Sequence, residues 1–274
     1  MRCIFCKQDS SNSKSVEHII PQSLGGNKHI LGKGIVCDKC NNYFAREVEK
    51  PFLENSVIKL LRFDEGLESK KGKVPPVSAV MNGKHAVTLW KDINDKFAGH
   101  VDVPVKVFKT IKNSNRGSIV FPAFNDNLPL PKGSTLSRFL GKVAIEAFAF
   151  HILSSSTDLV EYFIDDDSFD PLRQHVRCGS VVHWPCGVRR IYEAKKRWVD
   201  EETQETCQVM NEFDFLLTGE SESESECYFV LALFGIEYVI NIVGPSIEGY
   251  ENWLLEHNNI SPLYRDENSP GHHL

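Results

Sequence analysis

The spacing of apolar side chains predicts helices in three parts of this chain. Residues 41–63 and 134–153 repeat apolar side chains every three or four positions, which gives a helix one buried face. The second of these stretches has the denser apolar face and should be the longest helix. Proline cannot continue a helix without a kink or a new turn, so Pro51 should interrupt the first stretch. A shorter helix is expected at residues 169–176.

Alternating apolar and polar residues predict strands in much of the remaining chain. The expected strands cover residues 15–19, 34–37, 86–90, 101–110, 180–183, 189–193, 210–218, 227–234 and 236–243. Residues 65–76 are polar, contain glycine and end in two prolines, which is typical of a linker. We therefore predict an α+β protein with an N-terminal domain at residues 1–75. A second domain at residues 76–274 should combine one long helix with a mixed, mostly antiparallel sheet, and its role is unassigned.

Composition supports a globular protein outside the membrane. The chain has 41% hydrophobic and 25% charged residues, and its N-terminus lacks the apolar stretch of a signal peptide. Its most apolar run, residues 227–243, is interrupted by Gly235, Glu237 and Asn241, so paired strands explain it better than a membrane span. We expect a cytoplasmic location, where close thiol pairs bind metal more often than they form disulfides.

Charge is distributed unevenly along the chain. Residues 1–73 carry 13 Lys and Arg against 9 Asp and Glu, although the whole chain has a net charge of −6. A basic segment on an acidic chain fits a phosphate-binding head. An ordinary solvated surface gives the same imbalance, so both interpretations remain open.

Two Cys-x-x-Cys pairs near the N-terminus predict a structural zinc site. The pairs are Cys3 with Cys6 and Cys37 with Cys40. Two intervening residues let a tight turn direct both thiolates to one ion, and Zn²⁺ takes four such ligands in a tetrahedron. The other cysteines lack paired spacing and should be small buried apolar residues: Cys178, Cys186, Cys207 and Cys227. A second zinc site at Cys178, His183 and Cys186 is a less favoured alternative.

The segment between the two pairs carries a second motif. Residues 17–26 read Glu-His-Ile-Ile-Pro-Gln-Ser-Leu-Gly-Gly, and Asn41 directly follows the last cysteine. This combination resembles the HNH endonucleases of the ββα-metal type, in particular the subgroup stapled by four cysteines. The resemblance covers residues 3 to about 50, and it implies a zinc-stapled ββα module at the start of the chain.

The resemblance also implies catalytic roles. His18 corresponds to the general base, while Glu17 and Asn41 correspond to ligands of a catalytic Mg²⁺ or Mn²⁺. The chemistry agrees, because a neutral imidazole can accept a proton from water and hard cations prefer oxygen ligands. Each residue also has a plainer interpretation: Glu17 and His18 could be a surface pair before a turn, and Asn41 could cap the following helix.

The motif departs from the family pattern at two positions. Glu17 replaces the commoner Asp, which lengthens the reach to a metal. The middle Asn of the family has no clear counterpart; Asn27 is the nearest residue but comes early in the sequence. If that position is vacant, backbone alone should orient His18. The two glycines at 25 and 26 should permit the turn of the hairpin.

Four basic residues could contact phosphates, or could be ordinary surface charge: Lys28, Lys33, Lys39 and Arg46. His29 and Glu49 are expected to lie outside the site, with Glu49 solvated. The sequence thus predicts a metal-dependent DNA endonuclease, with defence against foreign DNA as a setting by family analogy only. RNA remains open as a substrate, and double-strand breaks would require a homodimer or two successive nicks. The alternatives are a zinc-dependent nucleic-acid-binding adaptor that does not cut, and a nuclease gated by its C-terminal domain.

Overall fold

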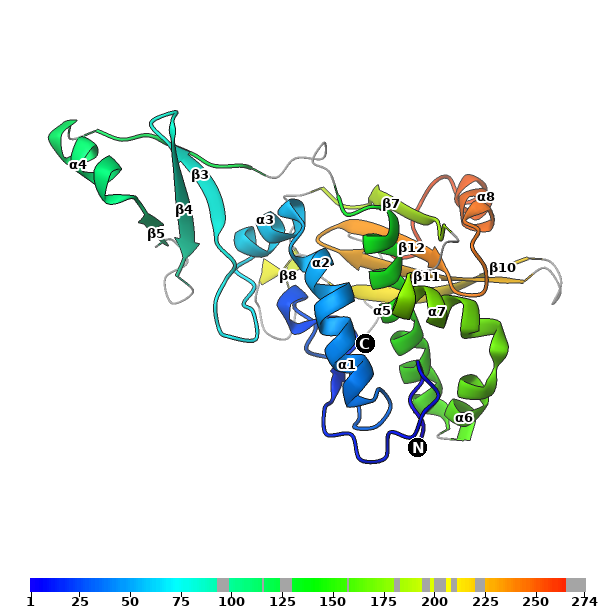
Figure 1. Cartoon of the computed structure of the whole chain (residues 1–274). Coiled ribbons are helices and arrows are strands. Elements are labelled where there is room, and N and C mark those ends of the chain that lie inside the picture. The colour runs from blue at the N-terminus through cyan, green and yellow to red at the C-terminus, as the bar shows by residue number, and fades with distance from the viewer. Residues whose placement is uncertain are drawn as a thin grey trace. The chain divides into compact units, whose positions relative to one another are not determined.

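The computed structural model of the chain describes residues 1–92, 99–114, 116–123, 130–156, 158–179, 183–193, 198–199, 206–207, 211–219 and 225–264 (Figure 1). The chain divides into two compact units. The first unit comprises residues 1–21, 26–52 and 132–274, and the second comprises residues 22–25 and 53–131. None of the described helices is both long enough and apolar enough to cross a membrane.

A short hairpin and a helix form the N-terminal part of the first unit. Strands β1 (Glu17–His18) and β2 (Ile30–Leu31) pair antiparallel and are followed by helix α1 (Asp38–Phe44). This is the ββα order that the resemblance implied. The strand expected at residues 34–37 is wrong, because these residues form only an isolated bridge between Lys33 and Val36.

The helix continues through Pro51 by changing its geometry. A π-helical segment, η2 (Ala45–Glu49), connects α1 to α2 (Lys50–Leu53). A proline ring collides with the carbonyl four residues earlier in a regular α-helix, and a wider turn relieves that collision. The expected irregularity at Pro51 is therefore present, as a π segment. A new helix, α3 (Ser56–Asp64), begins after Asn55, whose side chain accepts hydrogen bonds from the backbone N–H groups of Val57 and Ile58.

A four-stranded antiparallel sheet forms the centre of the first unit. Its strand order is β10 (Glu212–Thr218), β11 (Glu226–Leu233), β12 (Ile236–Asn241) and β7 (Cys186–Arg190). The expected strands at 210–218, 227–234 and 236–243 are confirmed, whereas most of the one at 180–183 lies outside the described residues. The two central strands are buried along their length because helices cover both faces of the sheet. This confirms a mixed fold with an antiparallel sheet.

Helices α5 (Gly133–Ser155) and α8 (Glu248–Glu256) lie on opposite faces of this sheet (Figure 1). Tyr250 of α8 packs on Tyr228, while Tyr238 faces the other side and meets Phe52 edge-on. The long helix is confirmed. Helices α6 (Asp158–Asp165) and α8 were not expected, whereas α7 (Asp170–Cys178), preceded by the short η3 (Asp167–Phe169), matches the helix expected at 169–176. A short β8 (Trp198–Val199) and β9 (Thr206–Cys207) pair separately.

The N-terminal segment shares one core with the residues after 131. The rings of Phe52 and Phe139 stack with centroids 3.8 Å apart, and Arg173 on α7 donates from Nε to the carbonyl of Ile4 at 2.9 Å. Arg2 also pairs with Glu161 and Asp165 on α6, at 2.6 and 2.7 Å. The compact units therefore do not follow the proposed boundary between residues 75 and 76. A nuclease function confined to residues 1–75 remains a prediction.

The second unit has its own sheet and core. Its strands lie in the order β5 (Gly99–Asp102), β4 (His85–Lys91), β3 (Val77–Met81) and β6 (Ile119–Val120), and helix α4 (Val105–Ser114) packs on them. The strand expected at 101–110 is wrong beyond residue 102. Valine at every second position from 101 to 107 imitates a strand, but the chain turns into a helix after Pro104.

Candidate metal centre and nuclease site

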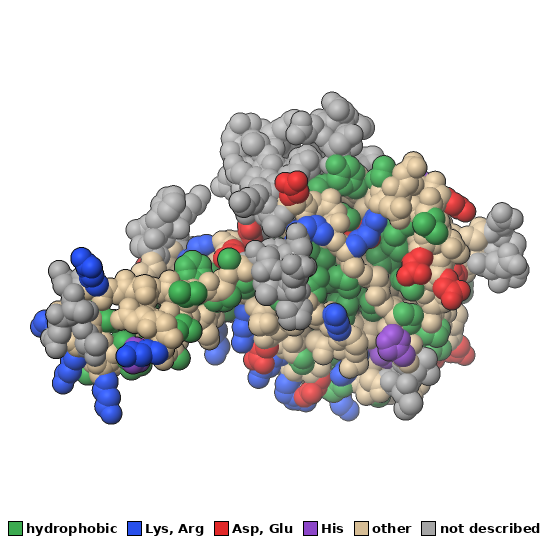
Figure 2. Space-filling view, turned by 90° about the horizontal axis from the view of Figure 1, so that it is seen from above, with side chains coloured by type: hydrophobic (Ala, Val, Ile, Leu, Met, Phe, Trp, Pro, Cys, Tyr) green, Lys and Arg blue, Asp and Glu red, His purple; other side chains and the backbone are tan. Residues whose placement is uncertain are grey.

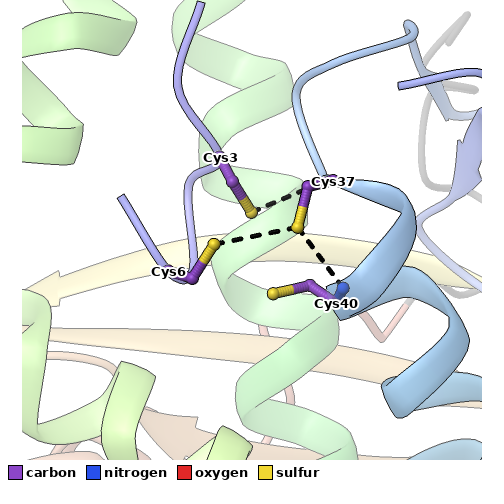
Figure 3. Close-up of side chains that lie close together, drawn as sticks. All are labelled: Cys3, Cys6, Cys37 and Cys40. Atoms are coloured by element: carbon purple, nitrogen blue, oxygen red, sulfur yellow. Dashed lines mark hydrogen bonds between the residues drawn. The ribbon is translucent and has the colours of Figure 1, made fainter. Parts of the chain in front are cut away.

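The four N-terminal cysteines converge as the spacing predicted. Their Sγ atoms all lie within 4.8 Å of one another (Figure 3). A tetrahedral zinc with bonds of about 2.3 Å places neighbouring sulfurs about 3.8 Å apart. The Sγ atoms of Cys6 and Cys37 are separated by 3.7 Å, so the cluster is compatible with a structural zinc ion.

Backbone N–H groups at the start of α1 support the thiolate form of this cluster. Cys37 is the N-cap residue of α1; its N–H donates to Cys3 Sγ at 3.3 Å, and the N–H of Cys40 donates to Cys37 Sγ at 3.4 Å. Hydrogen bonding from Cys40, opposed by burial, lowers the pKa of the Cys3 thiol to about 5, whereas burial raises the pKa of Cys6 to about 11 and the hydrogen bond to Cys3 raises the pKa of Cys40 well above its usual range. Of these three thiols, Cys3 is therefore the one that ionises most readily. Thiolate is the form that binds zinc, and N–H donors toward the sulfurs hold the ligands in position.

Among the described residues, the remaining cysteines form no second metal site. Burial raises the pKa of Cys186 to about 12 and that of Cys227 to about 11, which fits inert apolar residues. Cys178 is exposed, so the prediction that it is buried is wrong. The side chain of Cys207 is not among those that the structure describes. In the part of the chain that the structure describes, which includes His183, no other group of three or more His, Cys, Asp or Glu side chains lies close enough together to hold a metal ion.

His18 ends strand β1 and is half-buried, with its ring oriented by backbone. The Nδ1 atom lies 3.1 Å from the carbonyl oxygen of Gly26. A carbonyl can only accept, so a neutral ring in this contact carries its proton on Nδ1 and keeps a free lone pair on Nε2. The Gly26 carbonyl thus orients His18 through backbone, as expected if the middle Asn position of the family is vacant. Asn27, the nearest candidate for that position, is exposed.

Only glycine fits at position 26. A Cβ atom built there would overlap the carbonyl oxygen of Ile20 and approach the Ile20 Cβ to 2.8 Å. The preceding Gly25 has a φ of +85°, in the left-handed region that favours glycine. Both glycines of the motif therefore serve the turn, as expected, and Gly26 also brings the carbonyl to His18.

Glu17 points to the opposite face of β1, as the alternation of a strand requires. Its side chain is buried against α5, where Oε1 accepts from Lys142 Nζ at 2.6 Å. The same Nζ lies 2.7 Å from Glu49 Oε1 and 3.0 Å from Glu146 Oε2. Three elements thus contribute to one buried group of one ammonium and three carboxyls: β1, η2 and α5.

This carboxyl–lysine cluster (Glu17, Glu49, Lys142 and Glu146) has an excess of acid. Burial alone would lower the pKa of Lys142, but the surrounding carboxylates raise it well above the usual range, so the ammonium stays charged. Burial raises the pKa of Glu146 well above its usual range, despite the attraction of Lys142. Neither Glu146 oxygen has a hydrogen-bond partner among the described residues. We take Glu146 to be protonated, so that the Lys142 ammonium is shared by the Glu17 and Glu49 carboxylates and the cluster keeps a net charge of −1.

Sequence reasoning missed this cluster. Glu49 is buried at 8% exposure, so the expectation that it is solvated is wrong. Lys142 and Glu146 are fully buried and lie one turn apart in the apolar middle of α5, and that oppositely charged pair was the available signal. His29 is also packed: its ring meets those of Phe150 and Phe213 at centroid distances of 5.4 and 4.9 Å.

Asn41 lies beside the hairpin, on α1. Its Nδ2 donates to the carbonyl of Val16 at 3.3 Å, which leaves Oδ1 as the acceptor atom of the amide. Capping of the helix by Asn41 is wrong, because Cys37 is the cap and the Asn41 N–H already bonds within the helix to the Cys37 carbonyl.

The four basic candidates are all exposed: Lys28, Lys33, Lys39 and Arg46. Arg46 Nε pairs with Glu47 at 2.6 Å, so part of its charge is compensated within the helix. An exposed pair of this kind contributes little to stability.

Comparison with known proteins identifies the N-terminal segment. Residues 3–56 match the family model described as HNH endonuclease. Neither curated proteins nor solved structures gave a match to the chain. The matched residues contain the four cysteines, the Glu-His motif and Asn41, which confirms the resemblance drawn from the sequence. Residues 3–56, called the HNH segment below, therefore match the HNH endonuclease family model and contain a four-cysteine cluster compatible with zinc.

Proposed function

We propose that this protein is a metal-dependent endonuclease that hydrolyses phosphodiester bonds of DNA, with His18 as the general base. The observation that carries the proposal is the contact between His18 Nδ1 and the Gly26 carbonyl. It orients the imidazole and directs the basic Nε2 lone pair away from the backbone contact. In this role Nε2 accepts a proton from a water molecule as the water oxygen attacks the phosphorus.

The residues that would hold a catalytic Mg²⁺ or Mn²⁺ are Glu17 and Asn41. Lys142 engages Oε1 of the buried Glu17, so a cation would have to use Oε2 of this carboxylate, together with Asn41 Oδ1. Both are oxygen donors, which hard divalent cations prefer. A cation held there would stabilise charge on the phosphate and on the leaving 3′ oxygen, so that the products carry 5′-phosphate and 3′-hydroxyl ends.

The zinc has a structural role in this proposal. It joins residues 3–6 to the start of α1, and so fixes the helix that carries Asn41 against the hairpin that carries His18. The exposed Lys28, Lys33, Lys39 and Arg46 contact phosphates of the substrate. One catalytic cation cuts one strand, so the expected product is a nick, and double-strand breaks require a homodimer or a second nick. Defence against foreign DNA enters the proposal only by analogy with the family.

One observation favours a second candidate. The Glu17 carboxylate is buried and held by Lys142, a residue of α5 far along the chain. A ligand occupied in this way fits a nucleic-acid-binding adaptor that does not cut, or a nuclease whose C-terminal residues control the site. The adaptor predicts DNA binding without cleavage, and the gated enzyme predicts that cleavage increases when Lys142 is replaced.

The deciding experiment is nicking of supercoiled plasmid by the full-length protein with Mg²⁺ or Mn²⁺, with EDTA as the control. The full chain is required because α5 supplies the partner of Phe52 in the core. His18→Ala should abolish nicking while zinc content is retained. The matched control is His151→Ala, since His151 is an exposed histidine on α5, and this variant should nick like the parent. Nicking that survives in His18→Ala would overturn the proposal; DNA binding without nicking in the parent would favour the adaptor.

A further inference from the structure

The outward face of α4 combines basic and apolar side chains. Val107 is buried in the core of the second unit, and Ile111 packs on the same cluster. At about 100° per residue, the opposite side of the helix carries Val105, Lys109 and Lys112, and Phe108 lies on the flank between the two sides. All four are exposed; Val105 and Phe108 retain 72% and 58% of their accessible surface.

The charge of this segment is opposite to that of the chain. Residues 103–125 contain four Lys and Arg and no Asp or Glu, within a chain of net charge −6. Figure 2 shows Lys and Arg side chains on the part of the second unit that carries α4, on the left of the view. A local positive face attracts a polyanion even when the rest of the surface is acidic, because the potential is set mainly by charges within about 10 Å.

The apolar residues argue that this face is more than a solvated surface. Lysines alone would need no partner, but a phenylalanine and a valine exposed among them leave apolar area in water that burial would remove. DNA offers both complementary features, since phosphates bind lysine and the sugars and base edges in a groove accept apolar side chains. An acidic protein would match the charge only, and it serves below as the competing outcome.

We infer that the α4 face (Val105, Phe108, Lys109 and Lys112) is a DNA-binding surface that holds the duplex independently of the HNH segment. The inference rests on the proposed function, because it gives the same substrate a second contact. The sequence left the role of residues 76–274 unassigned, and this inference gives DNA binding to the part of that region that carries α4.

The test is the salt dependence of binding to a fluorescent 30-base-pair duplex, measured by anisotropy. All proteins carry His18→Ala, so that no cleavage interferes. Lys109→Ala/Lys112→Ala should weaken binding several-fold at moderate salt and reduce the slope of log K against log salt by about 1.8, because each phosphate contact contributes about 0.9. The matched control is Lys70→Ala/Lys71→Ala, an exposed lysine pair in a loop of the same unit, which should leave the slope unchanged.

A second variant tests the apolar part of the face. Val105→Ser/Phe108→Ser should weaken binding without changing the salt slope, since it removes no charge. Equal affinity and slope for parent, lysine variant and control would overturn the inference, as would absence of DNA binding in the parent. The latter result would also be obtained if the face binds an acidic protein. Plasmid nicking is scored separately, so a protein that binds DNA through α4 but does not nick leaves this inference standing while the nuclease proposal fails.

Discussion

Replacement of Lys142 by methionine tests whether the carboxyl–lysine cluster stabilises the site. Methionine keeps the length of the side chain and removes the only ammonium among the described residues that lies within 3.0 Å of Glu17, Glu49 and Glu146. With Glu146 protonated, two buried carboxylates remain without compensation, and we expect one of them to take up a proton so that the other can stay ionised. Protonating an ordinary glutamate with a pKa of about 4.3 at pH 7 costs about 3.7 kcal/mol. Breaking a buried ion pair on one side typically destabilises by about 3–5 kcal/mol, and we expect a loss of that size.

The assay is urea denaturation followed by fluorescence and circular dichroism, at pH 7 and at pH 5. At pH 5 the same protonation costs only about 1 kcal/mol. The loss of unfolding free energy in Lys142→Met should therefore be smaller at pH 5 than at pH 7, by about the difference between the two protonation costs. Lys132→Met is the matched control, because Lys132 is the exposed N-cap residue of the same helix and should change stability by less than about 0.5 kcal/mol. A loss at pH 7 no greater than that of the control, or a loss independent of pH, would refute the reasoning.

Three further predictions follow from the same geometry. Glu146→Gln should be tolerated and should flatten the pH dependence of stability. Because the pKa of Glu146 is raised, the folded state keeps a proton that the unfolded state has released, so the parent loses stability as pH rises above about 4.5. The free energy of unfolding measured from pH 5 to 8 should therefore fall less steeply in the variant. Gly26→Ala should reduce nicking at least tenfold with zinc content unchanged. The added Cβ overlaps the Ile20 carbonyl, so the backbone must move and the Gly26 carbonyl oxygen no longer orients His18. Nicking at the parent rate would contradict this role of Gly26. Zinc removal by a chelator, or Cys40→Ser, should lower the melting temperature markedly, with elemental analysis of the parent giving one zinc per chain; unchanged melting after zinc loss would argue against a structural metal.

The metal cluster and the hairpin were predictable because their signals are local. Two residues between paired cysteines set the thiolate geometry, and the glycines at 25 and 26 predict a turn that other residues cannot form. The long helix and the last three strands of the sheet were predictable for a similar reason, since dense apolar periodicity over many residues outweighs other influences.

The parts that sequence reasoning missed depend on contacts between distant residues. Glu49 looked solvated because a glutamate in a helix usually is, and its partner Lys142 lies on another helix. The association of residues 1–52 with those after 131 rests on pairs such as Phe52 with Phe139, which no local pattern reveals. The valines from 101 to 107 gave a false strand, because a period of two was read without weighing the helical spacing of Val107 and Ile111.

The most direct test of the general-base role is chemical rescue of His18→Gly by imidazole. The account predicts that this variant, folded and zinc-loaded, does not nick plasmid in the presence of Mg²⁺ or Mn²⁺. Added imidazole should restore nicking in a concentration-dependent manner, because a free base can fill the space of the missing ring. His18→Gly that nicks like the parent without imidazole would contradict the central claim that His18 accepts the proton from water.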